Sequence, residues 1–182
     1  MVTHTYTAED AKNKLVAGNQ KYVAARVASV DASEAVLKAS LGGQSPYAAV
    51  ITCSDSRVIP EAVFSAGIGE LFVIRVAGNV IDTDVLGSIE YASAHLGTEL
   101  VVVLGHDHCG AVDAALNHQN TGYTKHITDA ILKAIGNERD ELKASCLNAA
   151  HGCEVIKSSL PDIGITVVGA VYHLASGEVE FL

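Results

Sequence analysis

Cysteine and histidine side chains at two places in the sequence have the types and the spacing of metal ligands. Cys53 ends one apolar run, and His106 and Cys109 follow another in the order His-x-x-Cys. Thiolate and imidazole groups select zinc over magnesium or calcium. The His-x-x-Cys spacing places its two ligands about one turn apart, so that both can face one ion. Three protein ligands leave the fourth position of a tetrahedral zinc to water, which is typical of a catalytic site rather than a structural one.

Two charged residues next to Cys53 have the chemistry to support such a site. Two thiolates balance the charge of a zinc ion, so this ion should activate its water less strongly than a zinc held by three histidines. A nearby group that accepts a hydrogen bond from the water then matters more, and Asp55 is close enough in sequence to be that group. Arg57 could pair with Asp55 through two parallel hydrogen bonds and keep it ionised.

Each half of this pattern also has an ordinary structural interpretation. A single cysteine or histidine near a strand end is usually a packing residue, and an exposed Asp55–Arg57 ion pair would contribute only about 0–1 kcal/mol to stability. The presence of both clusters, each after a strand of one sheet, favours a metal site. The other two cysteines, Cys146 and Cys153, lie in a helical stretch about 10 Å apart along the axis, too far for a disulfide. We expect both to be buried small hydrophobic residues.

The apolar runs before the two clusters are typical of buried parallel strands. Continuous runs rich in valine and isoleucine indicate strands that are covered on both faces. Helical patterns lie between them, which predicts an α/β fold with a central, mostly parallel four-stranded sheet flanked by helices. Ser176-Gly177, between two short extended runs, predicts a hairpin that adds an antiparallel edge strand. The expected strands are residues 47–53, 71–76, 100–104 and 165–171, and the expected helices are residues 7–26, 31–41, 83–96, one beginning at Cys109, and 125–159.

Both candidate clusters follow the carboxyl ends of these expected strands. Open α/β sheets bind their ligands at that edge, because the loops that leave parallel strands gather there. The fold prediction and the metal-site prediction therefore support each other.

Size and composition indicate one domain without a nucleic-acid or membrane partner. The chain has 182 residues, 49% of them hydrophobic and 18% charged, with a formal net charge of −9. An acidic chain without a basic cluster gains no electrostatic help in binding nucleic acid or anionic lipid. The first residues lack the apolar core of a secretory signal, and no run approaches the roughly 18 apolar residues of a membrane helix. We expect a cytoplasmic protein.

Taken together, the motifs resemble the β-class carbonic anhydrases. The matching segments are CSDSRV at residues 53–58 and GHDHCGAV at residues 105–112, and further similarity lies in residues 15–23 and 69–79. The resemblance covers most of the chain. It implies a single β-carbonic-anhydrase-like domain over residues 1–182, with an N-terminal helical arm at about residues 1–42.

The resemblance also implies roles for individual residues. Cys53, His106 and Cys109 would hold one zinc ion per subunit, and Asp55 and Arg57 would form the acid/base pair.

Substrate-binding positions follow from the same resemblance. Gln44, in a GQSP segment, matches a substrate-binding glutamine of the plant-like branch, and Phe72 and Tyr91 match apolar pocket positions. The backbone N–H of Gly110 would steady the substrate oxygens. In the family this pocket lies at a dimer interface, so Gln44, Phe72 and Tyr91 would serve the zinc of a neighbouring subunit in a homodimer or homotetramer.

Three positions depart from the family pattern. Val76 replaces an asparagine, Asp107 replaces a serine or threonine after the zinc histidine, and His108 is unusual. Asp107 could raise the basicity of His106 or simply face solvent, and His108 could shuttle protons or be inert.

The implied activity is that of a carbonate dehydratase, a hydro-lyase. It is the reversible hydration of carbon dioxide to bicarbonate and a proton, with zinc-bound hydroxide as the nucleophile. One alternative is a carbonyl sulfide or carbon disulfide hydrolase on the same scaffold, which would differ in pocket access. A second is a non-catalytic zinc-binding relative, in which a group such as Asp55 would fill the fourth position. The sequence leaves open whether Asp55 lies beside the zinc or on it.

Overall fold

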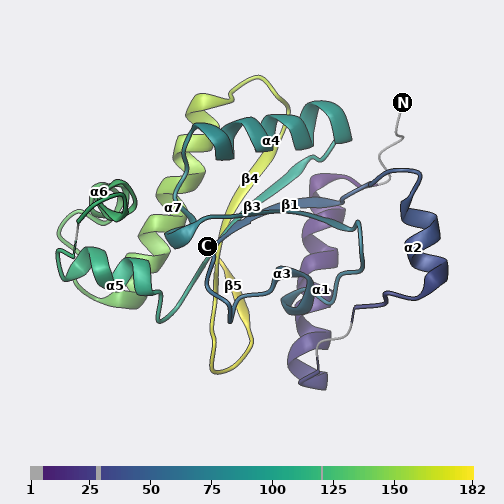
Figure 1. Cartoon of the computed structure of the whole chain (residues 1–182), viewed down its shortest axis with the longest axis horizontal. Coiled ribbons are helices and arrows are strands. Elements are labelled where there is room, and N and C mark those ends of the chain that lie inside the picture. Colours follow the sequence, from purple (N-terminus) through teal and green to yellow (C-terminus); the bar gives the residue numbers. More distant parts are fainter. Residues whose placement is uncertain (1–5, 28–29, 120) are drawn as a thin grey trace.

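A five-stranded sheet forms the centre of the computed structural model, which describes residues 6–27, 30–119 and 121–182 (Figure 1). The first four strands in the order β2-β1-β3-β4 are parallel, and β5 pairs antiparallel with β4. This confirms the α/β fold with a mostly parallel sheet of four strands and an antiparallel edge strand. The strands are β1 (Ala48–Thr52), β2 (Leu71–Arg75), β3 (Leu100–His106), β4 (Thr166–Tyr172) and β5 (Val179–Phe181).

Helices cover both faces of the sheet because the central strands are apolar on both sides. In β1, Val50 packs on the side of α1 (Ala8–Ala25) and α3 (Pro60–Val63), whereas Ile51 packs against α4 (Thr83–Leu96) and α7 (Glu141–Ser159). Figure 1 shows α1 and α4 on opposite sides of the sheet. Successive side chains of a strand point to opposite faces, which explains why such strands read as uninterrupted apolar runs.

The remaining helices lie at the two ends of the molecule. A third apolar cluster, which includes Cys53 and Cys109, packs against α5 (Gly110–Leu116) and α6 (Thr124–Ile135). A single 3₁₀ turn, η1 (Ala77–Asn79), follows β2. At the other end α2 (Glu34–Ser40) buries none of its residues and stands apart from the sheet (Figure 1).

Several expected boundaries are right and others need correction. Thr7 caps α1, with a reciprocal capping box to Asp10, and α4 has the expected bounds. The helical region expected over residues 125–159 consists of two helices, α6 and α7. Gly136 ends α6, and Asp140 starts α7 by accepting a hydrogen bond from the Lys143 N–H. The strand expected at residues 100–104 extends two residues further, to His106.

The two remaining cysteines differ in burial. Cys153 is buried, and burial raises its pKa to about 11. Cys146 is only partly buried, so the expectation of two buried cysteines is right for Cys153 alone. Both are free thiols, as expected.

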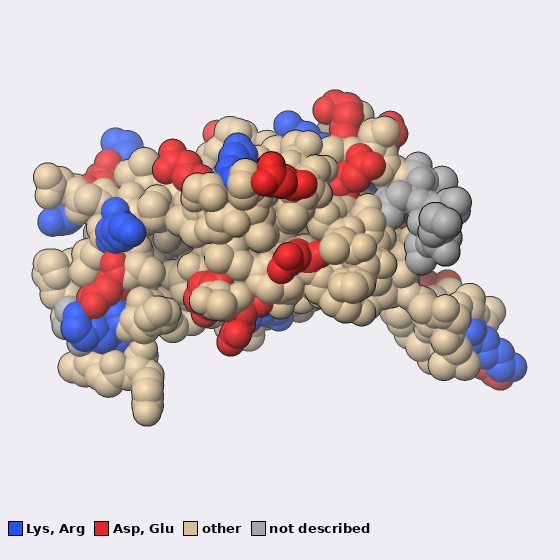
Figure 2. Space-filling view, turned by 90° about the horizontal axis from the view of Figure 1, so that it is seen from above, with Lys and Arg blue, Asp and Glu red and all other residues tan. Residues whose placement is uncertain are grey.

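Two surface observations complete the description. Over the residues that the structure describes, no helix is both long and apolar enough to cross a membrane. Figure 2 shows acidic and basic side chains dispersed over one face of the molecule, without a broad basic patch among the described residues of that face.

Candidate metal centre

Parallel pairing of β1 with β3 brings the two candidate clusters together. Thr52, the last residue of β1, lies opposite Leu104 of β3, so Cys53 directly after β1 lies beside the end of β3, where His106 stands. Cys109 follows three residues later as the N-cap of α5. Residues 53 positions apart in sequence therefore meet at the carboxyl edge of the sheet.

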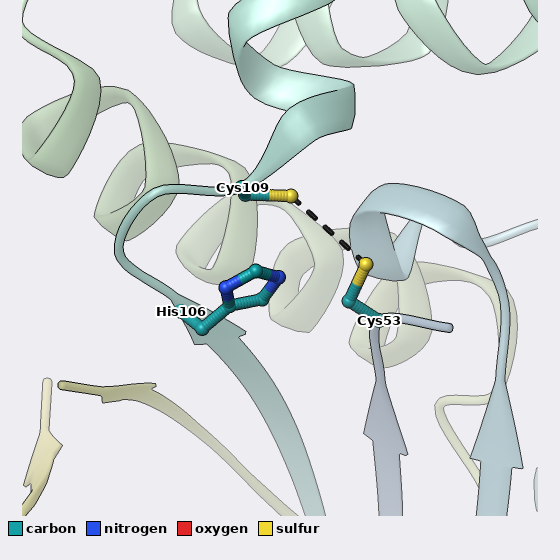
Figure 3. A group of neighbouring side chains, drawn as sticks. All are labelled: Cys53, His106 and Cys109. Carbon is teal, nitrogen blue, oxygen red and sulfur yellow. Dashed lines mark hydrogen bonds between the residues drawn. The ribbon is translucent and has the colours of Figure 1, made fainter. Parts of the chain in front are cut away.

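The three side chains form a compact, buried group (Figure 3). Their ligand atoms all lie within 4.8 Å of one another, and the two Sγ atoms are 4.0 Å apart. All three residues are at most 5% exposed. Among the described residues, His106 Nε2 has no hydrogen-bond partner, whereas Nδ1 bonds to the carbonyl of Asp107 at 2.7 Å. A buried ring nitrogen without a partner is costly, and a metal ion at this place would satisfy it.

The charges of the cluster also fit a cation. The hydrogen bond shared with Cys109 lowers the pKa of the Cys53 thiol, and the same interaction raises the pKa of Cys109. Burial lowers the pKa of His106, but contacts with Cys53 and the Asp107 carbonyl outweigh it and raise that pKa. Two thiolates this close repel each other, so both can ionise only with a cation between them. Two sulfurs and one imidazole are the donor set that zinc prefers.

Backbone N–H groups surround the Cys53 sulfur. Gly78 donates to Cys53 Sγ at 3.3 Å and Asp55 donates at 3.4 Å. Gly78 has φ +67, a left-handed conformation that favours glycine, so a larger residue at this turn would be strained. The side chain of Asn148 donates to the Gly78 carbonyl at 2.8 Å and holds this turn from α7. Sequence reasoning missed both residues. The signal that could have found Gly78 is the AGN triplet, whereas no feature of the local sequence indicates Asn148.

Asp55 and Arg57 form the bidentate pair that the sequence suggests. Asp55 Oδ1 accepts from the Arg57 backbone N–H and Nε, each at 2.9 Å, and Oδ2 accepts from Nη2 at 2.7 Å. The side-chain hydrogen bonds from Arg57 hold the pKa of Asp55 well below its usual range. Asp55 thus faces Arg57. Among the described residues, the group that could hold a metal ion consists of Cys53, His106 and Cys109.

Arg75 is a further residue of the site that sequence reasoning missed. From the end of β2 its Nε donates to the Cys53 carbonyl at 3.2 Å, and its Nη2 donates to the Asp55 carbonyl at 2.6 Å. These bonds fix the backbone between Cys53 and Asp55. The pairing of β1 with β2, with Thr52 opposite Arg75, is the signal that could have found it.

The structure separates the expected substrate-binding residues into two groups. Gly110 directly follows Cys109 and lies at the cluster. Gln44 is exposed and precedes β1, whereas Cys53 follows β1, so the five-residue strand, roughly 17 Å long, separates them. Phe72, near the start of β2, contacts Tyr91 of α4 with ring centroids 6.2 Å apart. Gln44 and Phe72 therefore lie toward the amino end of the strands, away from this chain's own cluster.

A small apolar hollow lies next to the cluster. It has a volume of about 240 Å³, and its walls include Ala77 and Gly110, the chain neighbours of Gly78 and Cys109. Ala111, Ala114 and Ile127 supply further apolar wall. Such a hollow suits a small, uncharged ligand beside the Cys53–His106–Cys109 cluster.

Comparison with known proteins identifies the family. A sequence model of the family described as carbonic anhydrase matches residues 48–179, which include every residue of the cluster. This chain belongs to the β-class carbonic anhydrase family. It is 43% identical to carbonic anhydrase 2 of Mycobacterium tuberculosis over 177 residues, or 88% of this chain and 86% of that protein.

Solved structures of β-carbonic anhydrases share the fold. The enzyme CafA of Aspergillus fumigatus superposes with a TM-score of 0.73 at 27% identity, covering 94% of this chain and 88% of that one. One of two tetrameric β-carbonic anhydrases from Sordaria macrospora gives a TM-score of 0.70 at 25% identity, over 94% of this chain and 93% of that one. The family resemblance of the motifs is thus confirmed over nearly the whole chain.

Proposed function

We propose that this protein catalyses the reversible hydration of carbon dioxide to bicarbonate and a proton, as a zinc-dependent carbonate dehydratase. The observation that carries the proposal is the buried Cys53–His106–Cys109 cluster with the Asp55–Arg57 pair beside it. Membership of the carbonic anhydrase family supports the activity. The donor set and the unpartnered Nε2 of His106 support zinc as the metal.

Zinc bound by Cys53, His106 and Cys109 would supply Lewis acidity that activates water for attack on carbon dioxide. The protein's part is to supply two thiolates and one imidazole from a rigid sheet edge. Hydrogen bonds from Gly78 and Asp55 to Cys53 Sγ stabilise that sulfur as a thiolate.

Asp55 acts as a hydrogen-bond acceptor for the attacking water. Because Arg57 keeps it ionised, both carboxylate oxygens are acceptors only. Oδ2 receives one hydrogen bond from Arg57 Nη2, which leaves it capacity for a second from water. Arg57 also donates to the His108 carbonyl at 2.9 Å, so that one guanidinium orients Asp55 and the second ligand loop together.

The apolar hollow beside Gly110 receives the substrate. Carbon dioxide is small and uncharged, so it gains from leaving water for the wall of Ala77, Ala111 and Ala114. Bicarbonate is charged and gains nothing from this wall, which favours its release. The N–H of Gly110, the first residue of α5, is available to donate to a substrate oxygen.

A stopped-flow assay with zinc-loaded protein at about pH 8 tests the activity. Hydration well above the uncatalysed rate is expected, and Cys53→Ser should lose both zinc and activity. The same preparation should release sulfide from carbonyl sulfide slowly or not at all. Zinc-loaded protein without hydration activity would overturn the proposal, and rapid sulfide release alone would favour the hydrolase alternative.

The active form is a homodimer or a higher homo-oligomer. Three features support this: Gln44 and Phe72 lie away from their own cluster, α2 buries nothing within the chain, and Leu37 and Leu41 on this arm are exposed. A second copy could cover these leucines and receive Gln44 at its own zinc. Light scattering after size exclusion would test the assembly; a monomer that is fully active would contradict it. A cytoplasmic location stays a prediction, which cell fractionation would check.

A further inference from the structure

The turn between the second and third metal ligands is held in a strained conformation. His108 has φ 50, in the left-handed region that non-glycine residues rarely adopt. Such a residue persists only where its surroundings fix it. The turn carries His106 on one side and Cys109 on the other, so whatever fixes it also fixes the distance between two ligands.

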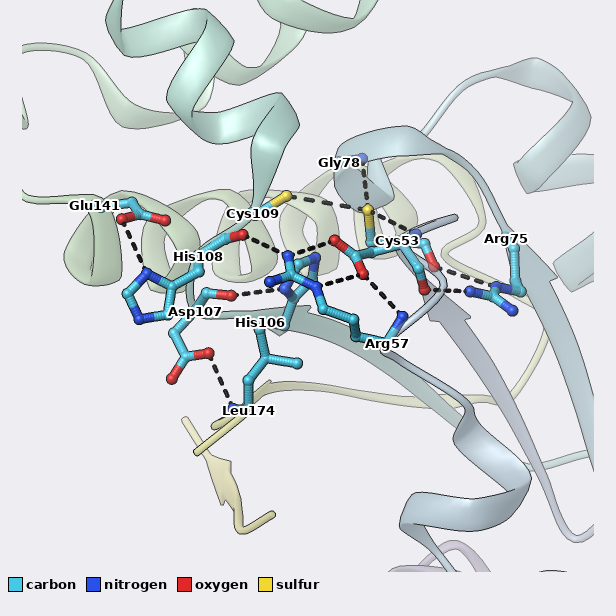
Figure 4. A network of polar contacts seen from close by, with 11 residues as sticks. Cys53, Arg57, Arg75, Gly78, His106, Asp107, His108, Cys109, Glu141 and Leu174 are labelled. Atoms are coloured by element: carbon cyan, nitrogen blue, oxygen red, sulfur yellow. Dashed lines mark hydrogen bonds and ion pairs between the residues drawn. The ribbon is translucent and has the colours of Figure 1, made fainter. Parts of the chain in front are cut away.

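The carboxylate of Asp107 connects this turn to Leu174, which lies just after the end of β4 (Figure 4). Its Oδ1 accepts a hydrogen bond from the Leu174 N–H at 3.0 Å, and its Oδ2 lies 3.4 Å from His173 Nδ1. The backbone N–H of Asp107 donates to the Tyr172 carbonyl at 3.1 Å. The side chain is 17% exposed, so the carboxylate faces the protein rather than solvent.

The same residue determines how the His106 ring is oriented. The carbonyl of Asp107 lies 2.7 Å from His106 Nδ1, which makes Nδ1 the protonated nitrogen and leaves Nε2 free for a metal. The position of this carbonyl depends on the peptide that the Asp107 carboxylate and N–H hold in place. Asp107, which is not one of the three cluster residues, thus sets the tautomer and the orientation of the His106 ring.

We propose that Asp107 is a positioning residue of the metal centre, whose carboxylate anchors the strained ligand turn to Leu174 and thereby orients His106. The inference rests on the zinc centre proposed above. The proposed role depends on the ability of Asp107 Oδ1 to accept the hydrogen bond from Leu174, and not on the negative charge of the carboxylate.

Zinc affinity of the full-length protein, measured by competition with a chromophoric chelator, tests this proposal. Asp107→Ala should bind zinc about 10- to 100-fold more weakly, as is typical when a group that orients a metal ligand is lost. Asp107→Asn keeps an oxygen that can accept from Leu174 and should stay within about threefold of the wild type. Asp82→Ala serves as matched control, because Asp82 Oδ1 also accepts a backbone hydrogen bond, from Val85 at 2.9 Å, but only caps α4.

A spectroscopic readout separates positioning from general destabilisation. Nitrogen-15 chemical shifts of His106 in the zinc-loaded protein should report protonated Nδ1 in the wild type and in Asp107→Asn, and a weaker Nδ1 hydrogen bond in Asp107→Ala. Should Asp107→Ala fail to fold, Asp107→Ser, which is too short to span to Leu174, takes its place with the same expected loss.

Two results would overturn the inference. Unchanged zinc affinity in Asp107→Ala or Asp107→Ser would show that the anchor is unnecessary, and equal losses in Asp107→Asn and Asp107→Ala would assign the effect to charge. If the wild type itself bound no zinc, the proposed function would fail first, so the two failures are distinguishable.

Discussion

Arg57 determines what Asp55 can do. It donates to both carboxylate oxygens and to the His108 carbonyl, so its loss would free Asp55 and loosen the second ligand loop at once. We expect Arg57→Gln to lower the rate of carbon dioxide hydration by about 100-fold, at the lower end of what positioned acid/base groups contribute, and to weaken zinc binding because the loop that carries His106 and Cys109 loosens. Stopped-flow kinetics and metal analysis would measure both.

The matched control for this substitution is Arg139→Gln. Among the residues that the structure describes, Arg139 makes hydrogen bonds only to its own loop, at Gly136 and Glu138, so its replacement should leave hydration unchanged. An Arg57→Gln protein that retains more than a third of the wild-type rate would contradict the assigned role.

The same pair gives stability a pH dependence of known sign. Hydrogen bonds from Arg57 lower the pKa of Asp55 in the folded protein. A lowered pKa contributes stability that is fully present above the unfolded value of about 3.9 and is lost as the pH falls toward the folded value. The metal-free wild type should therefore exceed Asp55→Asn in free energy of unfolding at about pH 5–7, and the difference should shrink below about pH 4. Urea titrations would measure it; a difference that widens in acid would be the wrong sign.

Residue types in the sequence were enough to propose the ligands and the acid/base pair, but not what surrounds them. The residue types and spacing of Cys53, His106 and Cys109 are typical of metal ligands. Only the fold brings Gly78, Arg75 and Asn148 near them, because these three act through hydrogen bonds with backbone groups. The contact of Asp107 with Leu174 spans 67 residues. Nothing in the local sequence indicates it, since it depends on the pairing of β3 with β4.

At the scale of elements, the close approach of α1 to α3 depends on one glycine. A Cβ at Gly18 would lie 1.9 Å from the Phe64 carbonyl oxygen, a backbone atom that cannot turn aside. We expect Gly18→Ala to lower the free energy of unfolding by about 3 kcal/mol, the upper end for overpacking, because α1 must shift as a whole. Urea denaturation would measure this change.

Gly87→Ala is the matched control on another helix. Gly87 lies within α4 and has open space where its Cβ would be. Alanine there should stabilise the protein by about 0.5–1 kcal/mol, because it restricts the unfolded chain without a clash. Opposite signs for the two substitutions would confirm the packing argument, and a tolerated Gly18→Ala would refute it.

Element types were predictable from periodicity, but some boundaries were not. The parallel strands are apolar on both faces and therefore easy to recognise. The sequence pattern predicts an end of β3 that is two residues too early, because Gly105 and His106 are residue types common in loops. Both nevertheless pair with β4. The division of the last helical region into α6 and α7 depends on a cap at Asp140 that the continuous helical pattern conceals.

At the scale of the whole molecule, the placement of Gln44 predicts sites shared between subunits. Cys53→Ser should lack zinc but still present Gln44, whereas Gln44→Ala should hold zinc but lack the glutamine. In a two-fold dimer that mixes the two variants, one site of two is intact, so random co-expression should recover about a quarter of wild-type activity. Hydration assays of the co-purified mixture would measure this.

Each variant expressed alone is the control for that mixture. Activity of the mixture equal to the average of the two separate variants would contradict shared sites. It would place Gln44 either at its own chain's zinc or outside the reaction.

The central claim is that Cys53, His106 and Cys109 hold a zinc ion at the carboxyl edge of the sheet. X-ray absorption at the zinc edge of the purified protein tests it most directly. The structure predicts one zinc per chain with two sulfur ligands at about 2.3 Å and an imidazole nitrogen at about 2.0–2.1 Å, and a loss of one sulfur or of the metal in Cys109→Ser. A zinc shell without sulfur, or one that is unchanged in Cys109→Ser, would contradict it.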